Sequence, residues 1–384
     1  MVRNTLYRAL KAIGPFRRVV RYLRARLDIY RPNVWVLEGT ERWSGECLKV
    51  VVTGQLEHRN FLANLVFGGP WAEITRRRMW LWNIFRLANR RGTDYGLVMV
   101  DTAVPSCRAY EKYGWFLVPA WIRTEVDLMT AAEQIKRSTS IKSDLSKIRK
   151  NRFEFEIRTG EDEFEHFYHE TYIPYARNVY GDMAFLDTYE DMKNKVGICE
   201  FLVITQDTGQ IAEQMLLYED GGIRAYALGI KGANREYVKQ GALAAVYYFS
   251  ILYATRKGHK KLHLGGARPF VKDGVLQYKK KWGARIVGNT SRWFVFKVVH
   301  ESVATRAFLA KNPFVYESDG KLVGAVFIDD GTFCSNEEVK RIERDYHDLG
   351  LGSVRIFDLS HTRTTDASNL FPQVSESDVA VRRI

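Results

Sequence analysis

From residue 33 onward, apolar residues fall into short alternating runs and longer helical repeats. In the first part of the chain we predict strands at 34–37, 48–53 and 61–67, a helix at 71–91, a strand at 97–100, a helix at 106–112 and a strand from 115. The run at 97–100 is wholly apolar, which is typical of a strand buried on both faces. The order β-β-β-α-β-α-β predicts an α+β unit with helices packed on a sheet.

A similar order recurs in the second part of the chain. A basic, polar helix at 130–151 and a strand at 153–157 precede an aromatic-rich helix at 162–180. We then predict strands at 201–205, 211–218 and 223–230, an apolar helix at 241–256 and a strand at 261–264. The repeated β-β-β-α-β order indicates one fold present twice, an internal duplication rather than a solenoid.

Two flanking segments complete the division of the chain. Beyond residue 300 we predict strands at 314–316, 322–327 and 354–357, a helix at 336–349 and a polar end after 361. The domain prediction is therefore fourfold. It comprises a basic amphipathic N-terminal helix at 1–32, a first, degenerate unit at 33–129, a linker helix with the second unit at 130–300, and a small α+β appendage with a polar tail at 301–384.

Charge narrows the range of partners. The net charge is +13, which favours nucleic acid, anionic lipid or another polyanion. The first 31 residues hold nine Lys or Arg and one acid, Asp28, in an amphipathic pattern broken at Gly14-Pro15. Such a helix either lies on an anionic membrane surface or packs on the first unit with solvated arginines. The sequence has no apolar run of about 18 residues, so it predicts no membrane-spanning helix.

Cysteine and histidine patterns exclude several kinds of site. Four cysteines (Cys47, Cys107, Cys199 and Cys334) lie far apart and form no CxxC pair, which argues against a disulfide scaffold or a cysteine zinc site. There is no HExxH, and His166 and His169 lie in a helix crowded with acids and aromatics, so we expect no metal site. This cysteine usage suits a reducing cytoplasm. The basic N-terminal helix would add peripheral contact with the inner face of the membrane through residues 1–31.

The segment at 261–283, KLHLGGARPFVKDGVLQYKKKWG, carries the most informative chemistry. It predicts a buried strand, a Gly265-Gly266 break, a polar loop and a short helix with three consecutive lysines. Backbone and ammonium groups brought together in this way can bind an anionic or carbonyl ligand. The alternative is a surface lysine cluster after a tight turn.

Two motifs carry a family resemblance. Residues 106–115 resemble the A-x-x-x-Y-x-x-x-G-F run of the GNAT acyltransferase fold, although the turn at Gly68–Trp71 lacks that fold's glycine-rich pyrophosphate loop. Residues 33–299 as a whole resemble the tandem-GNAT Fem-type transferases (FemABX). The matching motifs are Ser143–Lys150, similar to R-x-x-I-R-K, and Tyr278–Gly283, similar to F-K-x-x-F-G. The helical arm that some members insert is absent, and the tail beyond 300 is additional.

The resemblance implies a cytoplasmic acyltransferase of cell-envelope biogenesis with two GNAT-like domains in tandem. Such an enzyme transfers an acyl or aminoacyl group to an amine of a cell-envelope or sugar-linked precursor. In Fem-type enzymes the lysine of F-K-x-x-F-G polarises the donor carbonyl, and Lys279 stands at that place. The expected donor is aminoacyl-tRNA or acyl-coenzyme A, used as a substrate, and no tightly bound cofactor is expected. Binding to tRNA would weaken steeply with salt.

The remaining site residues are chosen by position and chemistry. No Ser/His/Asp order appears, so we expect direct attack on a bound donor, with Asp182 or Glu213 as the base. Acceptor-binding candidates are Tyr175, Arg177, Tyr180 and Tyr278, although a packing role fits them too. Donor-binding candidates are Lys231, Arg235, Lys239 and Gly241, where a strand opens into a helix.

Two other classes of function stay open. A non-catalytic basic protein that binds RNA or a membrane surface would keep the duplicated GNAT-like fold for its charge. An aminoacyl-lipid synthase would share the tandem fold, but such enzymes usually carry membrane helices.

Overall fold

The computed structural model describes residues 30–90, 92–103, 113–207, 209–219, 222–290, 292–329, 336–359 and 381–383. Three predictions fall outside these residues: the basic N-terminal helix with its membrane contact, the helix at 106–112, and residues 360–380 of the polar tail. Across the described segments, no helix has both the length and the apolar character that crossing a bilayer requires.

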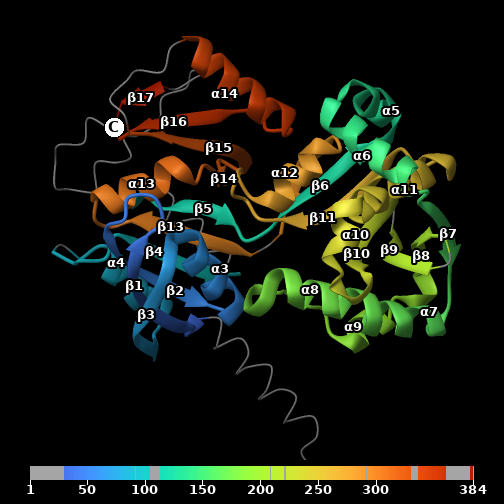
Figure 1. Cartoon of the computed structure of the whole chain (residues 1–384). Coiled ribbons are helices and arrows are strands. Elements are labelled where there is room, and N and C mark those ends of the chain that lie inside the picture. Colours follow the sequence, from blue (N-terminus) through green and yellow to red (C-terminus); the bar gives the residue numbers. More distant parts are fainter. Residues whose placement is uncertain are drawn as a thin grey trace, which may run out of the picture.

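A ten-stranded sheet forms one half of the molecule (Figure 1), in the order β17-β16-β15-β14-β5-β13-β4-β2-β1-β3. Its strands are β1 (Asn33–Glu41), β2 (Cys47–Gly54), β3 (Phe67–Arg78), β4 (Leu97–Thr102), β5 (Phe116–Pro119), β13 (Trp293–Val298), β14 (Phe314–Ser318), β15 (Lys321–Ile328), β16 (Val354–Asp358) and β17 (Val381–Arg383). Helices α3 (Leu56–Val66) and α13 (Val303–Lys311) share a core with one face of this sheet. Helix α4 (Leu81–Ala88) packs on the other face.

A seven-stranded sheet forms the other half, in the order β12-β6-β11-β10-β9-β8-β7. Its strands are β6 (Ile122–Asp127), β7 (Glu154–Arg158), β8 (Cys199–Gln206), β9 (Gly209–Glu219), β10 (Gly222–Ile230), β11 (Lys261–Ala267) and β12 (Ala284–Asn289). One face packs on α5 (Leu128–Arg137), α6 (Thr139–Lys150) and α11 (Ala242–Arg256). The other packs on α7 (Glu161–His166), the π-helix η2 (Phe167–Tyr172), α8 (Ile173–Tyr180) and α9 (Tyr189–Lys193).

Short helices connect these layers. They are η3 (Gly181–Met183), η4 (Val196–Ile198), η5 (Lys231–Ala233), α10 (Arg235–Gln240) and α12 (Gly274–Lys281), with α14 (Asn336–Asp348) near the end of the chain. Helix α14 contributes Tyr346 to a core that also contains Ile122 of β6 and Leu276 of α12.

The two sheets exchange strands. β6 precedes the linker helices in the chain, yet it lies between β11 and β12 and pairs antiparallel with both. β13 follows the second unit, yet it lies between β4 and β5 of the first sheet and is antiparallel to both. The predicted boundary near residue 130 thus divides the chain in sequence, whereas the exchanged strands join the halves in space.

The segment beyond residue 300 continues the first sheet. β14 pairs with β5 through Glu317 and Leu117, and β15 and β16 follow it. Its predicted strands and helix are found at β14, β15, α14 and β16, with small differences at their ends. The α+β class is confirmed, and the strands beyond residue 300 belong to the ten-stranded sheet.

Two elements of the first unit were predicted wrongly. The predicted strand at 61–67 is mostly helix α3, whose buried residues His58, Leu62, Ala63 and Val66 recur at helical spacing. The first part of the predicted helix at 71–91 is strand β3, and only Leu81–Ala88 is helical. β3 is a mostly exposed edge strand paired with β1, so its backbone partner, and not an apolar pattern, fixes its structure.

Candidate active-site cleft

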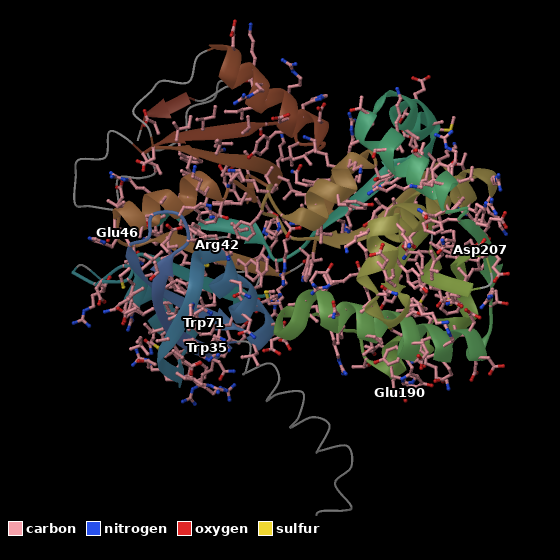
Figure 2. All side chains as sticks on the ribbon, viewed as in Figure 1. Trp35, Arg42, Glu46, Trp71, Glu190 and Asp207 are labelled. Carbon is pink, nitrogen blue, oxygen red and sulfur yellow. The ribbon has the colours of Figure 1, made fainter. Side chains whose placement is uncertain are left out.

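A cleft of about 1530 Å³ lies between α3 of the first sheet and the α8, β10, β11 and α12 side of the second sheet. Its volume exceeds the usual range of small-molecule pockets, which is about 300–1,000 Å³. The first-sheet side includes Arg42, labelled in Figure 2 together with Trp35 and Trp71 of the same sheet. The cleft can therefore hold two substrates, or one large one.

Lys279 is a buried lysine in the wall of this cleft. Asp273 caps α12 by accepting hydrogen bonds from the backbone N–H groups of Val275 and Leu276, at 3.0 Å each. One turn further along, the Lys279 side chain is 4% exposed, and its Nζ donates to the backbone oxygen of Gly266 at 2.6 Å. Burial lowers the pKa of Lys279 to about 7, although the nearby Asp273 carboxylate acts in the opposite direction.

Two glycines within β11 position the Gly266 backbone oxygen that accepts the hydrogen bond from Lys279. Gly265 has φ +71°, a left-handed conformation that favours glycine. At Gly266 a Cβ atom would lie 3.3 Å from the Trp121 ring, which is a tight contact. The pairing of β11 with β6 is irregular between His263 and Gly266. The strand therefore continues through both glycines to Ala267, and the predicted break is only a register irregularity, at the point where Lys279 bonds to Gly266.

The three consecutive lysines have different surroundings. Lys280 donates to the backbone oxygen of Asp345 at 3.3 Å, and Lys281 pairs with Asp144 of α6. Among these three, Lys279 is the one that lines the cleft. The alternative of a surface lysine cluster therefore fits its two neighbours but not Lys279.

Three of the four predicted acceptor residues line the same cleft. Tyr175, Tyr180 and Tyr278 lie on its wall with Tyr247, whose ring meets Tyr278 edge-on at 5.1 Å between centroids. Burial raises the pKa of Tyr175 to about 12 and also raises that of Tyr278. Their hydroxyl groups therefore stay protonated at neutral pH and can donate hydrogen bonds. Arg177 is exposed on α8 and does not line the cleft.

Arg268 is a cleft residue that was not predicted. Its guanidinium carbon lies 3.8 Å from the Trp121 ring centroid and 4.2 Å from that of Phe61, so the two rings hold it. The residue is 6% exposed, and its Nη1 donates to the backbone oxygen of Ala120 at 3.1 Å. Within the described residues no carboxylate pairs with it. Burial lowers the pKa of this guanidinium, which still remains a cation at pH 7.

A buried ionic cluster lies behind the same wall. The Nδ1 atom of His58 is 2.7 Å from Asp101, and Arg292 binds the same carboxylate. Burial lowers the pKa of His58, so its ring is neutral, and Nδ1–H donates to Asp101. The ring lies 4.4 Å from that of Phe185, which lines the cleft. Residues 58, 101 and 292 form no motif in the sequence, so only the fold reveals this cluster.

The predicted bases lie away from Lys279. Asp182 is exposed on η3, where its backbone oxygen accepts a hydrogen bond from Asn60 at 3.3 Å. Glu213 is fully buried on β9 and does not line the cleft, whereas the next residue, Gln214, does. Successive residues of a strand face opposite sides, so Glu213 faces α7 and η2 instead. The structure brings neither carboxylate to the cleft.

The predicted donor-binding residues also lie outside the cleft. Lys231, Arg235 and Lys239 are exposed on η5 and α10, and Lys239 is 3.4 Å from Glu236. Gly241 joins α10 to α11 with φ +104° and packs on Lys147. These residues form a basic surface rather than a pocket, and their role stays a prediction.

No family model matches the chain, and no curated protein matches its sequence. Among solved structures, L-PGS from Bacillus licheniformis is similar at 11% identity and a TM-score of 0.35, over 70% of this chain and 86% of that one. FemX is similar at 9% identity and a TM-score of 0.35, over 67% and 83%. A GCN5-related N-acetyltransferase-like protein from Streptococcus suis gives 12% and 0.26, over 68% and 82%. The case for a function therefore rests on the geometry of the cleft.

Proposed function

We propose that this protein transfers an acyl or aminoacyl group to an amine, with Lys279 stabilising the donor carbonyl. The observation that carries the proposal is a fully buried lysine in the wall of a cleft large enough for two substrates. Burying an ammonium costs folding free energy, so its position in a cleft wall points to a functional role, and with a pKa of about 7 part of the population is cationic at neutral pH.

The proposed reaction is nucleophilic attack of an amine on an ester or thioester. The amine nitrogen attacks the carbonyl carbon, the C–N bond forms, and negative charge develops on the carbonyl oxygen. The Lys279 ammonium can donate to that oxygen, which is the usual electrostatic contribution to acyl transfer. The leaving alcohol or thiol takes the electron pair of the broken bond. The proton lost from nitrogen goes to solvent or to the leaving group.

The other cleft residues support a polar acceptor. The tyrosine hydroxyls of the wall can orient an amine-bearing substrate, and Arg268, whose partner among the described residues is the Ala120 backbone oxygen, can donate further N–H groups to a phosphate or carboxylate. We propose an amine of a cell-envelope or sugar-linked precursor as acceptor. The exposed cations of η5 and α10 suit the backbone of a tRNA donor, with acyl-coenzyme A as the other candidate.

Lys279→Met tests the proposal, with Lys280→Met as the matched control on the same helix. Purified protein is given acetyl-coenzyme A or charged tRNA, with donor binding measured by calorimetry and by a shift assay across a salt series. We expect Lys279→Met to lower turnover by about 10²–10³-fold with donor binding retained, as for the loss of an oxyanion donor. Lys280→Met should behave as wild type.

Each result decides between the candidate functions. Salt-sensitive binding of charged tRNA without coenzyme A affinity would favour aminoacyl transfer, and the reverse would favour a conventional N-acyltransferase. Unchanged turnover in Lys279→Met would refute the role of this lysine. Binding of RNA or anionic vesicles with no turnover would favour a non-catalytic protein.

A further inference from the structure

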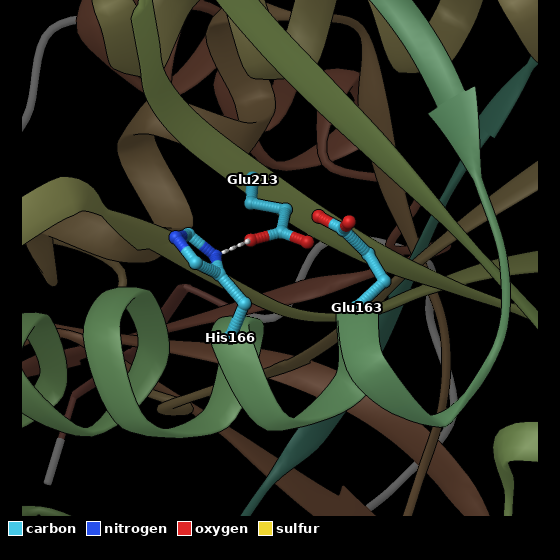
Figure 3. A group of neighbouring side chains, drawn as sticks. All are labelled: Glu163, His166 and Glu213. Atoms are coloured by element: carbon cyan, nitrogen blue, oxygen red, sulfur yellow. Dashed lines mark ion pairs between the residues drawn. The ribbon is translucent and has the colours of Figure 1, made fainter.

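Glu163, His166 and Glu213 come together between α7 and β9 (Figure 3), and none of the three lines the cleft. Glu163 and His166 are three residues apart on α7, so they lie on one face of that helix. Glu213 reaches them from β9, and its Oε2 is 3.7 Å from His166 Nδ1. One potential ligand atom from each residue lies within 4.8 Å of the others.

The backbone holds the two elements in close contact at this point. Glu213 pairs with Gly229 of β10, and a Cβ atom at Gly229 would lie 2.3 Å from the backbone oxygen of Thr171 in η2. Glycine is therefore required for η2 to approach the sheet so closely. The segment from α7 into η2 departs from regular α-helix here, as helices often do at functional sites.

Glu213 has an unused acceptor at the centre of the cluster. The residue is fully buried, and its Oε2 accepts a hydrogen bond from Gln210 Nε2 at 2.8 Å. Its Oε1 is also buried and has no hydrogen bond of normal geometry within the described residues, although the Thr171 hydroxyl of η2 is close enough to act on the pKa of Glu213 and lower it. A buried carboxylate oxygen left in this way is costly without a proton or a cation. Burial, together with the nearby Glu163, raises the pKa of Glu213 to about 9.

We propose that Glu163, His166 and Glu213 bind a first-row divalent cation, with zinc or manganese as the best fit. One imidazole and two carboxylates are a donor set common to these ions. Atoms bound to one zinc ion lie roughly 3–4 Å apart, since each bond is about 2.0–2.2 Å long. The cluster therefore needs only a small contraction, and the partly exposed His166 and Glu163 leave a route from solvent.

Arg158 is the group that competes with the ion. Its Nη1 lies 3.2 Å from Glu163 and also donates to Gln210. The same guanidinium binds Glu156, so it keeps a carboxylate partner when Glu163 turns to the ion. The Glu163 and Glu213 carboxylates, once bound to the ion, would balance a divalent charge.

Calorimetric titration of the full-length, chelator-treated protein with ZnCl₂ and with MnCl₂ tests the site. We expect saturable binding of one ion per chain and a higher Tm with the ion. His166→Ala should weaken binding at least about tenfold, as should Glu213→Gln. His169→Ala is the matched control, since this exposed histidine lies three residues further on and faces Glu165 instead.

Absence of saturable binding for both ions would overturn the proposal, as would unchanged affinity in His166→Ala. X-ray absorption at the zinc edge adds a second check, because nitrogen and oxygen ligands support this site whereas sulfur ligands would assign the ion to a cysteine. Glu213→Gln can alter stability through loss of a buried carboxyl, so His166→Ala decides the question.

Discussion

Lys279 has a cost in folding that its two neighbours on α12 do not have. Its ammonium is protonated in the unfolded chain up to about pH 10.5, but in the folded protein burial lowers the pKa to about 7. The unfolded state therefore binds more protons between these values, and stability must rise with pH in that window. Below pH 7 the full penalty is present, and above about pH 10.5 it is gone.

We therefore expect Lys279→Met to raise the free energy of unfolding by on the order of 5 kcal/mol at pH 6–7, since the pKa falls from 10.5 to about 7 and one pKa unit is worth about 1.4 kcal/mol. The gain should shrink as the pH approaches 10. Urea unfolding of wild type, Lys279→Met and Lys280→Met across this range measures it. A gain that does not change with pH would contradict a buried, titrating lysine.

Arg268 is the second residue whose surroundings predict an effect. Its guanidinium is held between Trp121 and Phe61 with N–H groups free for a ligand. Arg268→Met keeps an unbranched stem between the rings but removes the charge. We expect calorimetric binding of inorganic pyrophosphate to weaken about tenfold or more, as for loss of a charge-assisted contact.

Arg123→Met is the control for Arg268, because Arg123 also lines the cleft but is exposed. This variant should bind pyrophosphate nearly as wild type does. Equal weakening in both variants would mean that the cleft attracts anions by general charge, without a specific contact at Arg268.

At the scale of elements, the apolar pattern predicts helices and strands best where burial of their own apolar side chains determines the structure. β8, β9, β10 and α11 were all predicted close to their observed ends, because each buries a continuous apolar face, whereas β11 runs three residues beyond its predicted end. β3 was missed since its partner β1, and not its own side chains, holds it in place. An exposed edge strand leaves little signal in a single sequence.

The candidate-site residues also differ in whether a local motif identifies them. Lys279 and Tyr278 were found because they lie in one short motif, and the cleft confirms that they share a wall. Arg268 lies two residues after Gly266, yet nothing local distinguishes it, since its ring partners are Phe61 and Trp121. Glu213 was selected as a base from its strand position, but its side chain faces His166 of α7 and does not line the cleft. A single sequence does not show which residues far apart in the chain are in contact.

At the scale of the whole molecule, strand exchange makes the two sheets depend on each other. Removing β6 would leave a gap between β11 and β12, and removing β13 would separate β4 from β5. Arg292, which precedes β13, also binds the buried Asp101 of β4. Neither sheet is complete without a strand from the other part of the chain, so the cleft between them is held by covalent continuity as well as by packing.

Unfolding should therefore be one cooperative event. Phe294→Ala on β13 and Ile122→Ala on β6 each remove a fully buried side chain, at an expected cost of about 2–5 kcal/mol. Because each sheet needs the other's strand, both variants should lower the Tm of a single calorimetric transition, with equal shifts by circular dichroism and tryptophan fluorescence. Two separate transitions, with each variant moving only one of them, would show that the sheets fold independently despite the exchange.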